Sequence, residues 1–373
     1  MSIVVDARLN AYRNGGIPQY TRQLMHAMAA EAPTTAFTLL QHRRQPERLI
    51  TAANVTRRVV YTPPHHRWES WVLPLEIGVI RPQVVLFPDF VAPIRRNFPA
   101  VVTIHDLAFL HFDDLLDDNA KAFYAQVGQS AKRADGIIAV SQSTKNDIVT
   151  LLDIAPERVT VIHEAAAAHY TPLPLTPHER RRINNIDVTA NGYILFVSTI
   201  EPRKNLPVLL QALRIVRDRH PNRHYHLVAA GARGWRETPI LQQIDHLRLH
   251  DAITLLGSVH DDDLHWLYAN SRIYANPSRY EGFGLPLLEA LACGAPALAS
   301  DTSSLPEIGG DAPHYLPADD PLAWADALEL LWDDDAQRAT MAARGPVQAA
   351  TFSWQRAATE TLQLLNRVAK PIS

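Results

Sequence analysis

The stretch from Ser278 to Gly294 combines residue types that suit the binding of a phosphorylated sugar. The apolar residues 273–277 precede it, and Gly282 and Gly284 bracket a phenylalanine just before a predicted helix. Free N–H groups at a helix N-terminus attract anions, phosphate above all. The stretch also holds two carboxylates, which accept hydrogen bonds from sugar hydroxyls. The segment therefore predicts a pocket for a sugar joined to a phosphate.

Two adjacent cations, Arg203 and Lys204, follow a second predicted strand directly and precede a helix for which Asn205 is a candidate N-cap. Cations at this point would neutralise a diphosphate and stabilise it as a leaving group. The alternative is an ordinary solvated Arg-Lys pair. The position after a strand favours the phosphate interpretation.

Three further loops follow predicted strands. Gly15 and Gly16 open the first helix and permit close backbone approach to a ligand, although they match neither a dinucleotide fingerprint nor a P-loop. His105 ends a strand and suits contact with a hydroxyl or phosphate, against the alternative of a structural histidine. Ser258 and Val259 form a small-residue turn that suits a nucleobase, against the alternative of an ordinary turn.

Short apolar runs alternate with amphipathic stretches along almost the whole chain, which predicts crossover units and parallel sheets. In the first half we expect strands at residues 3–8, 37–41, 59–62, 84–88, 101–105, 136–141 and 159–163, and helices at 17–31, 68–79, 120–133 and 143–152. In the second half we expect strands at 193–198, 224–230, 253–256, 273–277, 297–300 and 314–316. The helices expected there are 206–219, 239–249, 261–269, 285–293, 304–308, 321–333 and 335–350.

Residues 165–179 interrupt this alternation with four alanines followed by prolines and threonines, which predicts an interdomain linker. We therefore expect an α/β chain of two doubly wound domains, residues 1–168 and 175–352. A last helix within residues 353–373 is expected to pack back on the first domain. Ligands of such sheets gather at the carboxyl ends of the strands, where the candidate loops lie.

Composition excludes several classes of protein. The 373 residues carry a formal net charge of −3, which argues against a nucleic-acid-binding protein. The single cysteine, Cys293, allows no intrachain disulfide and fits a reducing compartment. The N-terminus has no signal-peptide core, and no apolar run reaches the roughly 20 residues of a membrane span. These features predict a cytoplasmic protein.

Taken together, these segments resemble the retaining glycosyltransferases of family 4. The resemblance spans nearly the whole chain and includes the Gly15-Gly16 loop, His105-Asp106, Ser141 to Lys145, Glu201 to Asn205, Gly257 to Val259 and the block from Ser278 to Gly294. The last block is the most specific, since it carries the family's pair of glutamates with seven residues between, Glu281 and Glu289.

The resemblance implies the GT-B fold, two Rossmann-like domains facing across a cleft, with the acceptor bound mainly by the first and the nucleotide sugar by the second. It implies roles for the residues that match. Glu281 would hold the donor sugar and Glu289 the ribose of the nucleotide. Arg203, Lys204 and the N–H groups of Gly284 and Leu285 would bind the diphosphate, and Gly16 with Gly15 would approach it from the opposite domain. Gly282 and Phe283 would belong to the donor site, and Ser258 and Val259 would border the base. His105 would contact the donor sugar or stabilise the reacting centre.

The function implied is transfer of a hexose or deoxyhexose from a nucleoside-diphosphate sugar to an acceptor hydroxyl, with retention, in polysaccharide or glycolipid synthesis. GDP-mannose is the favoured donor, with UDP-glucose and dTDP-rhamnose as alternatives. The acceptor would be a saccharide or a lipid-linked saccharide. The family uses no dedicated metal and no cofactor, in keeping with the lack of an Asp-x-Asp motif at a strand end.

Other interpretations remain open at the level of sequence. A non-catalytic sugar-nucleotide-binding subunit would keep the donor pocket and lose a catalytic group. A nicotinamide-dependent oxidoreductase or epimerase would need a fingerprint after the first strand, which residues 10–16 lack. Trp68, Trp71, Arg95 and Arg96 suit peripheral contact with a membrane, against the alternative of a core helix and a solvated loop.

Overall fold

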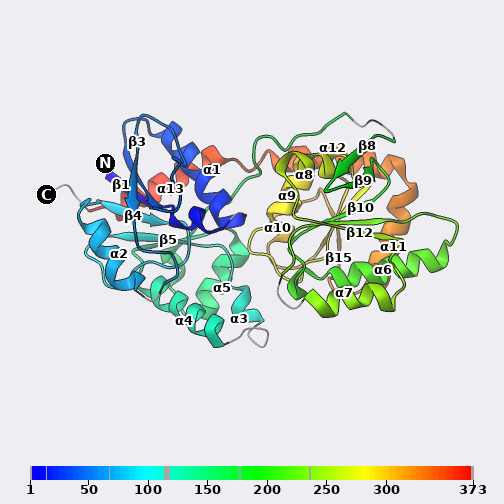
Figure 1. Ribbon diagram of the computed structural model, residues 1–373, viewed down its shortest axis with the longest axis horizontal. Helices are drawn as coiled ribbons and strands as arrows, with labels where there is room; N and C mark the ends of the chain where they lie inside the picture. Colours follow the sequence, from blue (N-terminus) through cyan, green and yellow to red (C-terminus); the bar gives the residue numbers. More distant parts are fainter. Residues whose placement is uncertain are drawn as a thin grey trace. The chain divides into compact units, whose positions relative to one another are not determined.

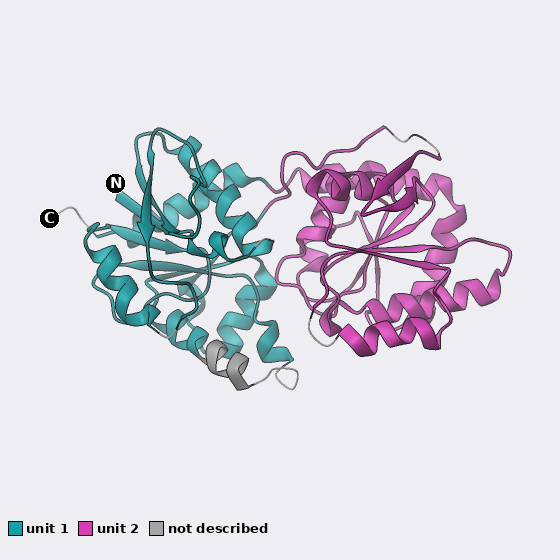
Figure 2. Ribbon diagram, viewed as in Figure 1, with its two compact units in different colours: residues 1–164, 353–373 teal, residues 165–352 magenta. Residues whose placement is uncertain are grey.

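Short apolar runs form two parallel sheets, one in each half of the chain (Figure 1). The computed structural model describes residues 2–13, 15–66, 68–112, 118–174, 176, 178–234 and 237–370. The chain divides into two units (Figure 2). Unit 1 comprises residues 1–164 and 353–373, and unit 2 comprises residues 165–352. The boundary at Glu164 and Ala165 falls at the start of the segment predicted as a linker.

The sheet of unit 1 has seven strands, all paired in parallel in the order β3-β2-β1-β4-β5-β6-β7. Their bounds are β1 Ser2–Asp6, β2 Ala36–His42, β3 Val55–Val60, β4 Val84–Phe87, β5 Ala100–Ile104, β6 Gly136–Ala139 and β7 Val159–Val161. The strand order reverses between β1 and β4. In doubly wound sheets, ligands bind outside the carboxyl ends of the strands at such a reversal.

Helices cover this sheet in two groups. Helix α1 (Gly16–Glu31) packs against α13 (Trp354–Val368), so the last described helix completes the first unit. Apolar residues line one side of α13, and the ring of Trp354 lies 5.8 Å from that of Tyr20 in α1. A buried cluster joins the sheet to α2 (Glu69–Gly78), α4 (Asp118–Arg133) and α5 (Gln142–Leu152). Short helices η1 (Arg8–Ala11), α3 (Ala108–His111) and η3 (Pro156–Arg158) complete the unit.

The sheet of unit 2 has six parallel strands in the order β12-β11-β10-β13-β14-β15. Their bounds are β10 Ile194–Val197, β11 Leu227–Ala230, β12 Ile253–Gly257, β13 Ile273–Asn276, β14 Ala297–Ser300 and β15 His314–Leu316. The order reverses between β10 and β13. The loops after these two strands therefore flank the position where a ligand is expected.

The helices of unit 2 also form two groups. A buried cluster joins the sheet to α6 (Leu206–Arg219), α7 (Glu237–His246) and α11 (Pro321–Asp333), and α6 packs on α7 and α11. Helix α9 (Leu285–Ala292) packs on α8 (Asp261–Ala269), α10 (Leu305–Gly309) and α12 (Asp335–Ala349). A 3-10 turn, η4 (Pro202–Lys204), precedes α6.

The structure differs most from the sequence-based expectation at three strands. An antiparallel hairpin of β8 (Arg180–Ile183) and β9 (Ile186–Thr189) was not predicted. Asn184 and Asn185 both have positive φ angles, 48° and 66°, which a two-residue hairpin turn requires. Strand β3 begins at Val55, four residues before the predicted start, because the polar residues Thr56, Arg57 and Arg58 of this edge strand hide the apolar alternation.

Candidate active site

The two loops that flank the reversal in unit 2 meet through a buried ion pair. Lys204, in the turn η4 after β10, places Nζ 2.7 Å from Oε1 and 2.6 Å from Oε2 of Glu281, in the loop after β13. Ser278 donates a hydrogen bond to Oε1 of the same carboxylate at 2.8 Å. Both charged side chains are at least nine-tenths buried. The predicted cation and the first of the two predicted glutamates therefore form one cluster.

Arg203 lies beside this pair and is more exposed to solvent. Its Nε lies 2.6 Å from Oε1 of Glu201, and its Nη1 lies 3.9 Å from Oε2 of Glu281. The backbone N–H of Arg279 donates to the carbonyl of Arg203 at 2.8 Å, which ties the two loops together. The cluster thus holds two cations and two carboxylates, with one guanidinium about one-fifth exposed.

The charges of this cluster shift the pKa values of its members. Burial and the adjacent charge of Arg203 lower the pKa of Lys204 despite its contact with Glu281. Burial acts to raise the pKa of Glu281, but the charges of Lys204 and Arg203 outweigh it and leave that pKa below its usual range. The carboxylate is therefore ionised at neutral pH and accepts hydrogen bonds from Lys204 and Ser278.

The glycine loop after Glu281 leads into the N-terminus of α9. Gly284 has a φ of 100°, and a Cβ added there would lie 2.9 Å from the side chain of Leu305. Ser304 Oγ donates to the carbonyls of Glu281 at 3.0 Å and Phe283 at 2.8 Å, which fixes the path of the loop through Gly282. Within the described part of the chain, the N–H groups of Gly284 and Leu285 donate to no protein acceptor. These two donors are available to an anion.

Asn205 occupies the N-cap position of α6, as predicted, but its side chain does not cap the helix. Its φ of 57° is left-handed, and its Nδ2 donates instead to the carbonyl of Ala318 at 2.7 Å. The amide thus anchors η4 to the loop that precedes α11. This contact positions Lys204, the neighbouring residue in the chain.

The other predicted donor-binding residues of unit 2 have contacts of their own. Glu289 sits further along α9, where Tyr268 Oη donates to its Oε2 at 3.1 Å. Ser258 and Val259 follow the edge strand β12, after Gly257 with its φ of 68°. The turn of the β8–β9 hairpin fixes this loop, because Asn184 Nδ2 donates to the carbonyls of Leu256 at 2.8 Å and Ser258 at 2.9 Å.

His105 stands at the carboxyl end of β5 in unit 1 and contacts acceptors at both ring nitrogens. Its Nδ1 lies 2.9 Å from Oε1 of Glu164, and its Nε2 lies 2.8 Å from the carbonyl of Pro88. Burial disfavours the charged ring, but the hydrogen bond and charge of Glu164 raise the pKa of His105 above its usual value. Because a carboxylate and a carbonyl oxygen are both acceptors, the two contacts favour the protonated form of the ring.

Gly15 and Gly16 begin α1, after β1 and η1. Gly15 has a φ of 118°, and a Cβ at either glycine would meet no atom within 4 Å. The backbone there is open to a ligand. Asn14, which precedes them, lies outside the described residues.

A buried ionic cluster lies at the reversal of unit 1, where the sequence indicated only Asp6 and Arg8, as residues that line a cleft. Arg8 contacts Asp6, with Nη2 2.7 Å from Oδ2, and also Glu69 at the start of α2. Next to it, His65 Nε2 lies 2.6 Å from Oδ2 of Asp89. Asp6 ends β1 and Asp89 follows β4, so both occupy the sheet edge at which ligands are expected. That placement is the feature that would have identified them.

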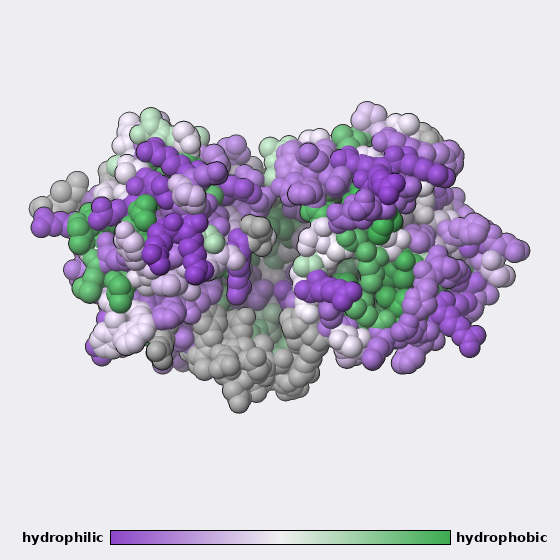
Figure 3. All heavy atoms as spheres, in the orientation of Figure 1, coloured by the Kyte–Doolittle hydropathy of each residue, from purple (hydrophilic) through white to green (hydrophobic). Residues whose placement is uncertain are grey.

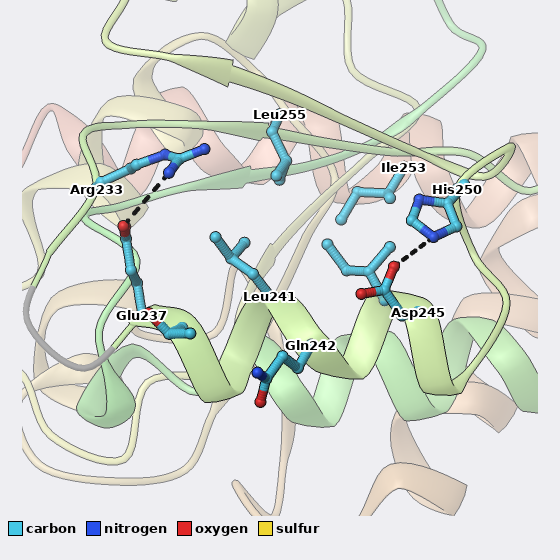
Figure 4. Close-up of a pocket in the computed structure, with 10 residues that line it drawn as sticks. Arg233, Glu237, Leu241, Gln242, Asp245, His250, Ile253 and Leu255 are labelled. Carbon is cyan, nitrogen blue, oxygen red and sulfur yellow. Dashed lines mark ion pairs between the residues drawn. The ribbon is translucent and has the colours of Figure 1, made fainter.

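Two other observations concern metal binding and a hollow among the described residues. Among those residues, no group of three or more His, Cys, Asp or Glu side chains is arranged to bind a metal ion. A hollow of about 440 Å³ lies between α7 and β12 and contains none of the predicted site residues (Figure 4). Its charged side chains and its histidine are paired with each other, Arg233 with Glu237 and His250 with Asp245.

The sequence of this chain matches known protein families. Residues 179–348 match the family described as glycosyl transferases group 1, and residues 14–170 match the one described as glycosyltransferase family 4. Over 300 residues the chain is 32% identical to O-antigen chain mannosyltransferase B of Escherichia coli, covering 80% of this chain and 77% of that protein.

Solved structures confirm the two-domain fold. Sucrose-phosphate synthase from Thermosynechococcus elongatus superposes with a TM-score of 0.74 at 17% identity, covering 98% of both chains. HepE of Anabaena, in complex with UDP and glucose, superposes with a TM-score of 0.70 at 16% identity, covering 98% of this chain and 100% of that one. Both are glycosyltransferases of the GT-B fold, so the predicted pair of Rossmann-like sheets is confirmed.

Proposed function

The chain belongs to the family 4 glycosyltransferases, and from this premise we propose that it is a retaining mannosyltransferase that uses GDP-mannose. The support for mannose is the 32% identity to an O-antigen chain mannosyltransferase. UDP-glucose and dTDP-rhamnose are the alternative donors. The acceptor is a hydroxyl of a saccharide or lipid-linked saccharide in the synthesis of a surface polysaccharide.

The observation that carries this proposal is the cluster of Lys204, Arg203 and Glu281 at the strand reversal of unit 2. It sets two cations beside the N-terminus of α9, where the N–H groups of Gly284 and Leu285 are available to an anion. A pyrophosphate bound there meets positive charge on both sides. The ionised carboxylate of Glu281 accepts hydrogen bonds from hydroxyls of the attached sugar.

In the proposed reaction, the bond between the anomeric carbon and the phosphate oxygen breaks while the acceptor oxygen bonds to the same face of the sugar. The acceptor's proton moves to the departing phosphate oxygen. Arg203 and Lys204 stabilise the charge that develops on that phosphate. Glu281 only accepts hydrogen bonds from the sugar in this scheme and forms no covalent intermediate.

The contact of Lys204 with both oxygens of Glu281 has a consequence for donor binding. The two charges hold each other in place until a donor arrives. Phosphate oxygens then compete for the ammonium group, and sugar hydroxyls compete for the carboxylate. Neither charge is left buried without a partner in either state, so the exchange avoids the full cost of desolvating one ion alone.

The remaining residues receive supporting roles in this proposal. Glu289 binds the ribose, and the backbone around Ser258 and Val259 borders the base. Gly15 and Gly16 are assigned to the diphosphate because the backbone there is open to a ligand, and His105 is assigned to the reacting centre.

We also propose that the reaction needs no metal ion or cofactor, because Arg203, Lys204 and the α9 N-terminus supply the positive charge that a divalent cation would otherwise provide. The proposed compartment is the cytoplasm. That assignment is in keeping with Cys293, a buried free thiol.

Donor identity is tested by thermal shift with GDP-mannose, UDP-glucose and dTDP-rhamnose. A donor at 100 times its dissociation constant stabilises the protein by about 2.7 kcal/mol, so the correct base raises the melting temperature by several degrees. No shift with any of the three would contradict the donor assignment.

Catalysis is tested by mannose transfer in the variants Arg203→Ala and Lys204→Ala, with Arg248→Ala as an exposed control in the same unit. We expect a loss of turnover of about 100-fold or more in the first two and none in the control. Donor-induced stabilisation of the natural protein without transfer would favour the non-catalytic sugar-nucleotide-binding subunit. The anomeric configuration of the product, measured by NMR, tests retention.

A further inference from the structure

Helix α2 of unit 1 is apolar on the side that faces the core and also on the side that faces solvent. Leu73 and Ile77 are fully buried. On the opposite side, large apolar residues are exposed, with exposed fractions of 55% for Trp68 and Trp71, 41% for Val72, 71% for Leu75 and 74% for Val79. At 3.6 residues per turn, these positions fall within an arc of about 100°. We call these five residues the α2 outer face.

The α2 outer face is a contiguous patch and not a set of scattered side chains. Figure 3 shows hydrophobic atoms gathered over the position of α2 in unit 1. An ordinary amphipathic helix of a globular domain has polar residues on the side away from the core. A contiguous exposed patch of this kind marks a binding surface.

Arginines border the α2 outer face. The guanidinium of Arg95 lies 4.2 Å from the ring centre of Trp71. A hollow of about 670 Å³ adjoins the C-terminal half of the helix and is lined by Leu75, Val79, Arg81 and Arg95, among others. Arg81 and Arg95 are exposed. Apolar side chains and cationic groups therefore share one surface.

The acidic residues of α2 do not offset this positive charge. Glu69 is buried in contact with Arg8. Glu76 accepts hydrogen bonds from the backbone N–H of Tyr61 at 2.8 Å and from Thr62 Oγ1 at 2.6 Å. Both carboxylates are therefore bound on flanks of the helix away from the outer face.

We propose that the α2 outer face binds the surface of a bilayer that contains anionic phospholipids. Trp68 and Trp71 have the large amphipathic rings that favour the membrane–water interface, and Leu75 and Val79 insert among the acyl chains. Arg81 and Arg95 pair with lipid phosphates, since each arginine near an anionic surface adds to the attraction. None of the described helices is long and apolar enough to cross a bilayer, so the contact is interfacial.

Membrane binding by the α2 outer face is separate from the transfer reaction, and the argument for it does not depend on the proposed function. It does fit the proposed acceptor, because a lipid-linked saccharide presents its hydroxyl close to the membrane surface. A protein that binds there searches for its acceptor in two dimensions.

The test is co-sedimentation of the full chain with vesicles of phosphatidylcholine mixed with phosphatidylglycerol, and with vesicles of phosphatidylcholine alone. The natural protein binds the mixed vesicles more tightly, and added salt weakens that binding. The double variant Leu75→Ser/Val79→Ser binds roughly tenfold or more weakly, because it loses two inserted side chains. Arg81→Ser and Arg95→Ser each weaken binding by about fivefold.

Matched controls come from unit 2. Leu330→Ser/Val347→Ser removes two side chains that are 56% and 71% exposed, and Arg248→Ser removes an exposed arginine. Neither changes vesicle binding. Since all the substituted residues are exposed, every variant keeps the natural melting temperature, and Leu75→Ser/Val79→Ser keeps its activity toward a soluble saccharide acceptor.

Three results would overturn the proposal. The first is failure of the natural protein to bind mixed vesicles at low salt. The second is equal loss of binding in the unit 2 controls and in Leu75→Ser/Val79→Ser. The third is concentration-dependent dimerisation that this α2 variant abolishes while vesicle binding persists, which would make the face an interface between copies of the chain.

Discussion

The Lys204–Glu281 pair predicts an unequal response to removal of either partner. Glu281→Gln leaves Lys204 buried beside the like charge of Arg203, and loss of one partner of a buried pair costs about 3–5 kcal/mol. Lys204→Met leaves Glu281 with the Ser278 hydroxyl at 2.8 Å and with Arg203 at 3.9 Å. We therefore expect a smaller loss, about 2 kcal/mol, for Lys204→Met.

The double variant Lys204→Met/Glu281→Gln removes both charges together. We expect it to lose less stability than the two single variants combined, with a coupling energy of about 2–3 kcal/mol. Urea-induced unfolding of all four proteins gives these energies. Thermal melting gives a second readout, since 3 kcal/mol corresponds to about 6–12 °C in a unit of this size.

The same four proteins separate stability from catalysis. The double variant regains stability relative to Glu281→Gln but not transfer activity, because the proposed phosphate and sugar contacts are both lost. If the stability loss of the double variant equals the sum of the two single losses within about 0.5 kcal/mol, the two side chains do not act as a buried pair. A larger loss of unfolding free energy for Lys204→Met than for Glu281→Gln would refute the argument that the charge of Arg203 makes the unpaired Lys204 the more costly of the two.

Three further predictions concern backbone, charge and capping. In thermal melts, we expect Gly284→Ala to destabilise unit 2 by about 2 kcal/mol more than Gly257→Ala. Both glycines have positive φ angles, but only a methyl group at position 284 meets a side chain, that of Leu305 at 2.9 Å. Glu164→Gln lowers the pKa of His105, followed by NMR of the ring protons. Folding raises the pKa of His105, so the stabilisation that the His105–Glu164 pair gives the folded protein is complete below about pH 6.5, the ordinary pKa of histidine. That stabilisation is lost as the pH rises through the pKa of His105 in the folded protein. An unchanged pH profile of unfolding in Glu164→Gln would exclude this linkage. Ser353→Ala lowers stability by about 1 kcal/mol, since its Oγ accepts from the N–H of Arg356 at the start of α13. A loss below about 0.3 kcal/mol would show that this cap is not needed.

Much of the fold follows from local sequence patterns. The parallel strands are short continuous apolar runs because both of their faces are buried, and such runs are visible in the sequence. The hairpin β8–β9 and the start of β3 were missed because their residues are polar and exposed at edges. Their pairing depends on tertiary contacts, such as those of Asn184 with the loop after β12.

The site was predictable to the extent that strand ends identify it. Arg203, Lys204 and Glu281 were found because two loops after strands carried unusual charges, and topology brings those loops together. The contact of Arg8 with Glu69 was missed because 61 positions separate them in the sequence and neither belongs to a recognisable motif. The acceptors at both nitrogens of His105 could not be predicted either, since Glu164 and the carbonyl of Pro88 come from distant segments.

The packing of α13 on α1 has a consequence for how the protein is made. A ribosome delivers residues 1–164 long before it delivers residues 353–373, yet α13, which packs on α1, lies in the second segment. Unit 2 emerges whole and is free to fold first. Until α13 has been made, the side of α1 that Trp354 covers next to Tyr20 lacks that partner, so we expect chains arrested before residue 353 to bind chaperones more strongly than chains that include α13.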